Sequence, residues 1–225
     1  MTKKRIRQIM AYIYMPLFFT IIGYGIVYLA AFPFIKTAGA IGSIITSDNV
    51  PDFSTDFNIL YDDDTAKKAS SDNSTVELSD ITMPYYGTQY GVISCSRIDF
   101  NAPLFFGDNS SILRNGVGQY IGSGIPGFNM PILLCGHNTT FCLPLQYIEK
   151  GDIVTIKTNY GTYEYEITDT QVHNMNDRSA YDLGKNEEQL IIYTCYPFDM
   201  LGNKTNRLFV YGNKISGPVI NGLNQ

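Results

Sequence analysis

The sequence contains no tryptophan, only two histidines and only four cysteines in 225 residues. Four cysteines are too few for a disulfide-dense scaffold, and a chain of this length can bury a hydrophobic core of its own. Charged residues make up 16% of the chain, below the usual share of about a quarter, and the net charge is −5. The composition therefore argues against a strongly charged nucleic-acid-binding protein and leaves few candidates for chemistry.

Tyrosine, phenylalanine and glycine are abundant, with 17, 13 and 20 copies. Aromatic residues favour strands and glycine favours turns, so the composition indicates β structure. Charge is distributed unevenly, because residues 1–35 hold four basic residues and no acidic one. All 21 acidic residues and the remaining 12 of the 16 basic residues lie in 36–225. We expect no phosphate-binding or nucleic-acid-binding surface in that part of the chain.

The N-terminus has the pattern of a membrane anchor. Four basic residues within 1–8 precede an uncharged run that ends at residue 35, and about 20 apolar residues suffice to cross a bilayer as a helix. Since basic flanks stay in the cytoplasm, we expect a cytoplasmic tail over 1–8, a single transmembrane helix over 9–35 and an extracellular remainder. A cleaved signal peptide is the alternative, but its apolar region is only about 7–15 residues long.

Residues 36–82 are predicted to form an acidic extracellular spacer. Between 46 and 80, nine acidic residues stand against two lysines, among many Ser, Thr and Asn residues. Such a stretch buries too little apolar surface to offset the conformational entropy that it loses on ordering. We therefore expect it to link the membrane to a folded domain over 83–225.

From residue 83 onward, short strands alternate with turns, and no long helical period occurs. The clearest strand is 161–167, where apolar side chains alternate with glutamates. A hairpin pairs it with 152–158. Further elements are expected as follows: strands at 91–95, 132–135, 190–195 and 207–211, and a short helix at 110–115. About eight short strands indicate a closed barrel or a sandwich.

The candidates for chemistry lie at strand ends. Cys195 ends one apolar run, and His137 follows another. Side chains at strand ends can be both rigidly held and accessible. Arg207 opens the next strand and shares a face with Phe209 and Tyr211, where a charge needs a partner. The thiolate is the nucleophilic form of cysteine and a nearby cation favours it, so a site that combines Cys195, His137 and Arg207 makes chemical sense.

The contexts of these three residues resemble a known family. His137 stands within Cys-Gly-His-Asn, Cys195 within Ile-Ile-Tyr-Thr-Cys-Tyr-Pro-Phe and Arg207 within Asn-Arg-Leu-Phe-Val-Tyr-Gly. In this order they resemble the sortases, the membrane-anchored cysteine transpeptidases of Gram-positive bacteria. Thr194 and Cys195 match the family motif Thr-Leu-x-Thr-Cys, whereas isoleucines replace its first two residues. The similarity extends over about 91–215 and, after the cysteine, is greatest to class D.

The resemblance implies a fold and a reaction. The fold is mostly β, a closed eight-stranded barrel with short helices, preceded by the transmembrane helix. The reaction is a two-step acyl transfer in which Cys195 attacks an LPxTG- or LPxTA-like sorting signal after its threonine and forms a thioacyl enzyme. The resemblance assigns general acid–base catalysis to His137 and stabilisation of the substrate or the oxyanion to Arg207.

The resemblance also implies partners and a location. Expected substrate contacts are Thr194, Asn138, Tyr196 and His173. The expected partners are surface proteins with C-terminal sorting signals and an amine of peptidoglycan or of its lipid-linked precursor. No cofactor and no metal are expected, and the catalytic domain lies outside the cell membrane that the N-terminal helix crosses.

Alternatives remain open at this point. Cys135 and Cys142 bracket His137, and with Cys195 they could bind zinc, although the usual Cys-x-x-Cys spacing is missing. A disulfide between Cys135 and Cys142 is possible outside the cell. A cell-surface adhesion module would use the same residues only structurally. His173 is alternatively an exposed loop residue.

Overall fold

The computed structural model of the protein describes the following residues: 14–28, 57–69, 71–199, 202 and 204–222. The chain divides after Val50 into two units, which we describe separately. In the first unit, residues 14–28 form a helix. Among the described residues, no helix combines the length and hydropathy needed to cross a membrane. The predicted tail 1–8 and the remaining parts of the predicted anchor, 9–13 and 29–35, lie outside the described residues.

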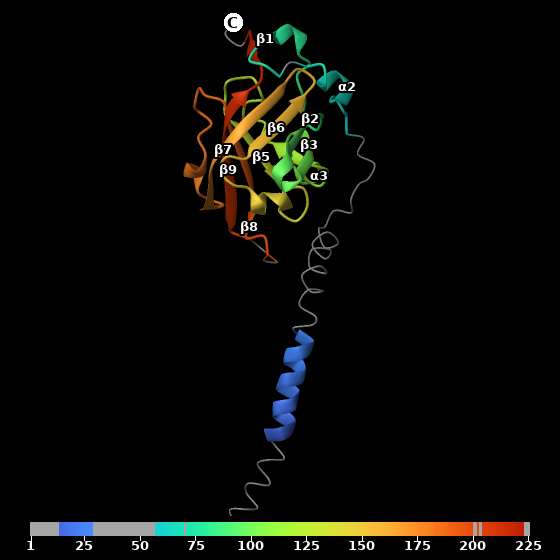
Figure 1. Cartoon of the computed structure of the whole chain (residues 1–225), viewed down its shortest axis with the longest axis vertical. Helices are drawn as coiled ribbons and strands as arrows, with labels where there is room; N and C mark the ends of the chain where they lie inside the picture. The colour runs from blue at the N-terminus through green and yellow to red at the C-terminus, as the bar shows by residue number, and fades with distance from the viewer. Residues whose placement is uncertain (1–13, 29–56, 70, 200–201, 203, 223–225) are drawn as a thin grey trace, which may run out of the picture. The chain divides into compact units, whose positions relative to one another are not determined.

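The described part of the second unit consists of β strands joined by turns and short helices (Figure 1). Eight strands form a closed barrel: β2 (Gln89–Cys95), β3 (Phe100–Phe106), β4 (Val117–Gln119), β5 (Ile132–Gly136), β6 (Ile153–Thr158), β7 (Thr162–Asn174), β8 (Gln189–Tyr196) and β9 (Asn206–Ser216). Two further strands pair in parallel: β1 (Thr75–Glu77) and β10 (Val219–Asn221). The helical elements are α2 (Asp63–Ala66), α3 (Ser110–Leu113), η1 (Leu78–Asp80), η2 (Ser96–Ile98), η3 (Leu143–Tyr147) and η4 (Arg178–Ala180).

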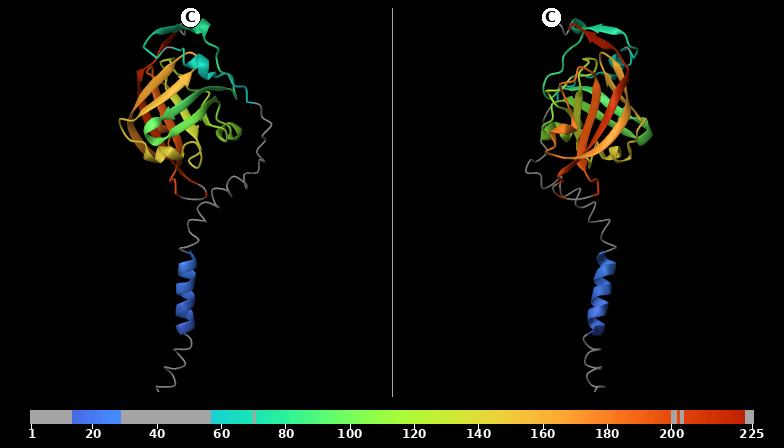
Figure 2. Two further views of the ribbon diagram at one scale, coloured as in Figure 1. Left: turned by 45° about the vertical axis from the view of Figure 1, so that its right-hand side comes forward. Right: turned by 90° about the vertical axis from the view of Figure 1, so that its left-hand side faces the viewer.

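The barrel closes in the order β2-β3-β4-β5-β8-β9-β7-β6, and Figure 2 shows the late strands, in orange and red, side by side in its wall. The predicted hairpin is present as β6 and β7, with Ile156 opposite Tyr163. Side chains from alternate positions of these strands fill the interior, where Tyr163, Tyr165 and Ile167 are fully buried. The expected fold, a mostly β, closed eight-stranded barrel with short helices, is confirmed.

Two barrel strands have no clear signal in the sequence. β3 contains Pro103, which lacks a backbone N–H and normally argues against a strand. It is tolerated one residue before the pairing of β3 with β4 begins at Leu104 and Val117. β4 is only three residues long and contains Gly118, so it shows neither alternation nor strand propensity.

Part of the predicted acidic spacer is instead ordered against the barrel. The backbone N–H of Leu60 donates to the carbonyl of Gln89 at 2.9 Å. The side chain of Asn159, in the β6–β7 turn, accepts from the N–H of Asp62 at 2.8 Å and donates to the carbonyl of Leu60 at 2.5 Å. Ala66 is buried among the acidic residues. Residues 57–69 and 71–82 are thus ordered, because a few apolar residues that the average composition hides anchor the segment, whereas 36–56 lies outside the described residues.

A buried carboxylate ties several barrel elements together. Glu188 precedes β8, and its side chain is only 4% exposed. It accepts hydrogen bonds from the Tyr165 hydroxyl at 2.6 Å and from the Gly127 N–H at 3.1 Å, and it forms an ion pair with Lys214 at 3.5 Å. All three partners are donors, so an ionised carboxylate satisfies them together.

Replacing this carboxylate is expected to destabilise the barrel. Glu188→Gln presents an NH₂ group to partners that only donate here, and it leaves the Lys214 ammonium without its counter-ion. We expect the free energy of unfolding to fall by about 3 kcal/mol, measured by urea denaturation. The matched control is Glu187→Gln, at the exposed neighbouring residue. Equal stability of the two variants would contradict this role for Glu188.

Candidate active site

Cys195 lies near the end of β8, on the outer face of the barrel. Thr194 precedes it and is 2% exposed, and its hydroxyl donates to the carbonyl of Gly136 in β5 at 2.7 Å. Because side chains alternate along a strand, the inward position of Thr194 directs Cys195 outward. The thiol is therefore partly exposed, whereas Cys95, Cys135 and Cys142 are buried.

Arg207 stands directly opposite Cys195 on the neighbouring strand. The two residues are partners in the antiparallel pairing of β8 with β9, and side chains at such positions lie on the same face with Cβ atoms about 5 Å apart. The Nη1 group of Arg207 donates to the carbonyls of Lys204 at 2.8 Å and Asn206 at 2.9 Å. These bonds orient the guanidinium and leave its remaining N–H groups available to a bound molecule.

His137 is held beside Cys195 by the residues that flank it. β5 and β8 run parallel, and their last pair is Gly136 with Thr194. On one side of His137, the carbonyl of Gly136 accepts the Thr194 bond described above. On the other side, the amide of Asn138 donates to the carbonyl of Cys195 at 2.7 Å. His137, which follows β5, and Cys195, in β8, are therefore held close together at one rim of the barrel.

The environment of His137 favours its neutral form. The ring is partly buried, and this burial lowers its pKa because it disfavours the imidazolium. The positive charge of Arg114 lowers the pKa further. When protonated, the ring therefore releases its proton more readily than an exposed histidine does.

The other thiols are not arranged as metal ligands. Cys142 packs inside the barrel core, whereas Cys135 pairs with Tyr193 on β8 and shares its outer face. Burial raises the pKa of Cys135 to about 12. Over the described ranges, no three or more His, Cys, Asp or Glu side chains gather as a metal site, and all four cysteines are free.

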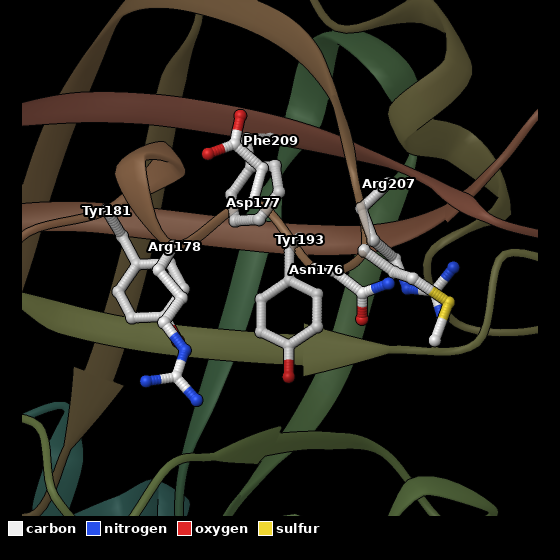
Figure 3. A pocket seen from close by; sticks show the side chains of 8 residues that line it. Asn176, Asp177, Arg178, Tyr181, Tyr193, Arg207 and Phe209 are labelled. Carbon is white, nitrogen blue, oxygen red and sulfur yellow. The ribbon is translucent and has the colours of Figure 1, made fainter.

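A cavity of about 480 Å³ extends from Arg207 across the outer face of β8 and β9. Its floor is aromatic, because Phe209 stacks on Tyr193 and on Tyr181 with ring centroids 5.5 and 6.3 Å apart. Its wall comes from the connection between β7 and β8. Figure 3 shows Arg178 and Arg207 at opposite ends of the row of side chains, with Tyr193 between them. The cavity is thus an aromatic groove with a guanidinium at each end.

The predicted substrate contacts occupy different environments. Thr194 and Asn138 are buried, at 2% and 4% exposure, and their polar groups bind the backbone as described above. Tyr196 is 36% exposed and meets Phe198 edge-on at 6.3 Å. His173 is not in a loop but on β7, directly opposite Arg207. Of the four residues, only His173 thus lies opposite a residue that lines the cavity.

The wall of the cavity was not anticipated from the sequence. Met175, Asn176, Asp177 and Arg178 lie in an irregular connection whose sequence has no strand or helix pattern. The floor had a usable signal, because residues two apart on a strand share a face. Tyr193 therefore shares the face of Cys195, and Phe209 shares that of Arg207. The wall had none, since its position depends on contacts between residues far apart along the chain.

Comparison with known proteins identifies the family. Residues 93–215, more than half of the chain, match the family model described as Sortase domain. The chain therefore belongs to the sortase family, and this membership implies a cysteine transpeptidase. The chain is also 34% identical over 133 residues to Sortase D of Bacillus subtilis (strain 168), a match that covers 59% of this chain and 67% of that relative.

Solved structures agree on the fold. A Clostridium perfringens Sortase D5 transpeptidase superposes with a TM-score of 0.54 at 21% identity, covering 59% of this chain and 82% of that one. Sortase C1 of Streptococcus agalactiae gives 0.51 at 26% identity, covering 56% and 66%. Sortase A of Listeria monocytogenes gives 0.51 at 23% identity, covering 57% and 88%. The barrel is thus similar to those of sortases of three classes.

Alkylation should distinguish Cys195 from the other thiols. We expect the native protein to take up one equivalent of iodoacetamide, on Cys195, because this thiol is the partly exposed one of the four. Burial raises the pKa values of the other three thiols and suppresses their thiolates. Intact-mass spectrometry measures the uptake, with Cys195→Ala as the variant that should take up none. Labelling of Cys135 at a similar rate would contradict this assignment.

The titration of His137 is expected to lie below the usual histidine pKa of about 6.5. Removing the charge of Arg114 with Arg114→Gln should raise the pKa, because a nearby cation disfavours the imidazolium. NMR of the ring protons measures the pKa, and His137→Gln assigns the signal in a chain with two histidines. Arg178→Gln is the control that should leave it unchanged. A pKa at or above the usual value would contradict the effect of burial.

Proposed function

We propose that this chain is a membrane-anchored sortase that cuts an LPxTG- or LPxTA-like sorting signal after its threonine. It then joins the released protein to an amine of peptidoglycan or of a lipid-linked precursor. The pairing of Cys195 with Arg207, with His137 fixed at the same rim, is the observation that supports the proposal. It places a partly exposed thiol beside a cation and a group able to transfer protons.

In the first step, the thiol of Cys195 passes its proton to the neutral imidazole of His137 as its sulfur attacks the carbonyl carbon of the substrate threonine. The carbon–nitrogen bond of the peptide breaks, and the leaving amine takes a proton from the His137 imidazolium. The product is a thioester between Cys195 and the N-terminal part of the substrate. The lowered pKa of His137 makes its imidazolium a stronger acid than that of an exposed histidine, which favours expulsion of the amine.

In the second step, an incoming amine attacks the thioester. His137, now neutral, removes a proton from the attacking nitrogen as the new carbon–nitrogen bond forms. The carbon–sulfur bond breaks, and the sulfur of Cys195 leaves as a thiolate. The proton held by His137 returns to the thiolate, which restores the thiol and the neutral imidazole, so the exchange of one amide for another needs no external reagent.

Arg207 stabilises the oxygen that becomes negative in both tetrahedral intermediates. Its backbone contacts to residues 204 and 206 hold the guanidinium in place before substrate arrives. Such pre-organisation avoids a reorganisation cost when charge develops on the substrate oxygen. The aromatic groove that starts at Arg207 has room for several residues of an extended peptide. We therefore place the residues before the scissile threonine along Tyr193, Phe209 and Tyr181.

We assign the protein to class D and to the cell surface. The Tyr-Pro-Phe continuation after Cys195 and the 34% identity to a Sortase D support the class. The basic residues in 1–8 and the uncharged run to residue 35 support a single membrane span with the N-terminus in the cytoplasm. The proposed orientation places the barrel outside the membrane, where surface proteins and cell-wall precursors occur.

A thioacyl intermediate tests the proposed function. The full-length protein in mild detergent is mixed with LPxTG and LPxTA peptides and analysed by intact-mass spectrometry. We expect a mass increase equal to the N-terminal part of the peptide, located on Cys195. Cys195→Ala should give none, while Cys95→Ala, at a buried thiol away from the rim, should retain it. Absence of the adduct with every peptide, or an adduct that persists in Cys195→Ala, would overturn the proposal.

A further inference from the structure

His173 has no role in the mechanism above, yet it lies beside the groove. It faces Arg207 across the pairing of β7 with β9, and its ring meets that of Phe209 edge-on at 5.6 Å. Since Arg207 in turn faces Cys195, His173 is the second residue from the thiol across the sheet. It sits at the base of the wall formed by the β7–β8 connection.

Both ring nitrogens of His173 meet oxygen acceptors. Nε2 lies 2.8 Å from Oε1 of Gln171, and Nδ1 lies 2.8 Å from Oδ2 of Asp177. The orientation of the Gln171 amide is fixed independently, because its Nε2 donates to the carboxylate of Asp169 at 2.6 Å. A carboxylate only accepts, so the amide must present its nitrogen to Asp169 and its oxygen to His173.

This arrangement requires a proton on each nitrogen of His173. Nε2 must donate to the amide oxygen, and Nδ1 must donate to the carboxylate of Asp177. Asp177 is held ionised, since hydrogen bonds from Ser179 and His173 lower its pKa to about 2. The ring that satisfies both contacts is the imidazolium, whereas either neutral tautomer would turn a lone pair toward an oxygen.

Asp177 connects this ring to the groove wall. One carboxylate oxygen binds His173, and the other accepts from the N–H and the hydroxyl of Ser179 at 2.9 and 2.6 Å. It thereby caps η4, which begins at Arg178. The far end of the turn is held by the Tyr211 hydroxyl, which donates to the carbonyl of Ala180 at 2.6 Å. The His173–Asp177 pair is therefore the anchor on the β7 side.

We propose that His173, as an imidazolium clamped between Gln171 and Asp177, is a positioning residue that holds the 175–181 wall in its peptide-binding form. Loss of one proton breaks one of the two clamp bonds, and the wall loosens. The assignment rests on the proposed function, since the wall is taken to bind the sorting peptide. It adds that peptide capture weakens when the clamp is lost, while the reacting groups at Cys195 are untouched.

The other charged and titratable groups around His173 are consistent with this role. Arg207 faces it from β9, and Asp177 faces it from the β7–β8 connection. Asp169 acts through Gln171 on its own strand, and Tyr181, Tyr193 and Tyr211 surround the neighbouring Phe209. Two adjacent cations would repel each other without compensation, and the carboxylate of Asp177 provides it. The clamp therefore depends on Asp177 as much as on His173.

Kinetics of thioacyl formation by the full-length protein test the proposal. In His173→Gln at about pH 6, we expect KM for the peptide to rise about tenfold and kcat to stay within about twofold. A tenfold rise corresponds to the loss of one charge-assisted hydrogen bond. The matched control is Val172→Ala, at an exposed neighbour on the opposite strand face. A loss confined to kcat, or an equal rise of KM in Val172→Ala, would overturn the proposal.

A measurement without substrate separates this proposal from the proposed function. Nitrogen-15 NMR of His173 at about pH 6 should show both ring nitrogens protonated. The amide of Ser179, which donates to Asp177, should exchange with solvent faster in His173→Gln than in Val172→Ala. If no peptide forms a thioester but both signatures appear, the function fails and the clamp stands. A neutral ring, or unchanged exchange at Ser179, overturns the clamp even if the thioester forms.

Discussion

The site depends on the parallel pairing of β5 with β8, which makes two strands end at the same rim of the barrel. Parallel neighbours point their C-terminal ends the same way, so the residues that follow Gly136 and Thr194 emerge together. The Thr194 hydroxyl and the Asn138 amide then bind backbone carbonyls across the two strands. β9 returns antiparallel to β8 and brings a guanidinium to the same rim. Three residues from distant parts of the sequence therefore meet without a long loop to position them.

The inward-facing side chains of β8 and β9 stabilise the barrel, and their outward-facing side chains form the site. Ile192, Thr194 and Val210 point inward and are buried, whereas Tyr193 and Cys195 point outward. Because alternation has a period of two, each outward residue is supported from behind by a packed neighbour. The groove floor is therefore rigid, because Phe209 belongs to a second buried cluster with Leu133 and Ile191 on this outer face. The wall is held by a few polar contacts at the ends of a short turn and by the packing of Ala180 and Tyr181 on that cluster.

The sequence allowed the rim residues to be predicted because strand ends leave a local signal. Cys195 and His137 each follow an apolar run, and Arg207 begins one, so their elements could be recognised before their contacts were known. Strands β3 and β4 could not be recognised from the sequence, since Pro103 and Gly118 are residue types that normally argue against a strand. The buried Glu188 and the clamp at Asp177 also escaped, because a carboxylate becomes structural only through partners far away in sequence, such as Gly127 and Lys214. The ordering of the segment after Phe57 could not be predicted from the sequence for the same reason, because it depends on contacts with distant residues such as Gln89 and Asn159.

The two histidines illustrate how neighbours decide what one residue type does. At His137, burial and the field of Arg114 both disfavour the charged ring, which keeps it able to exchange a proton. At His173, two oxygen acceptors and a compensating carboxylate require the charged ring, which makes it a fixed clamp instead. Each histidine must be stable near a guanidinium, that of Arg114 for His137 and that of Arg207 for His173. His137 meets this condition by being neutral, and His173 meets it through Asp177.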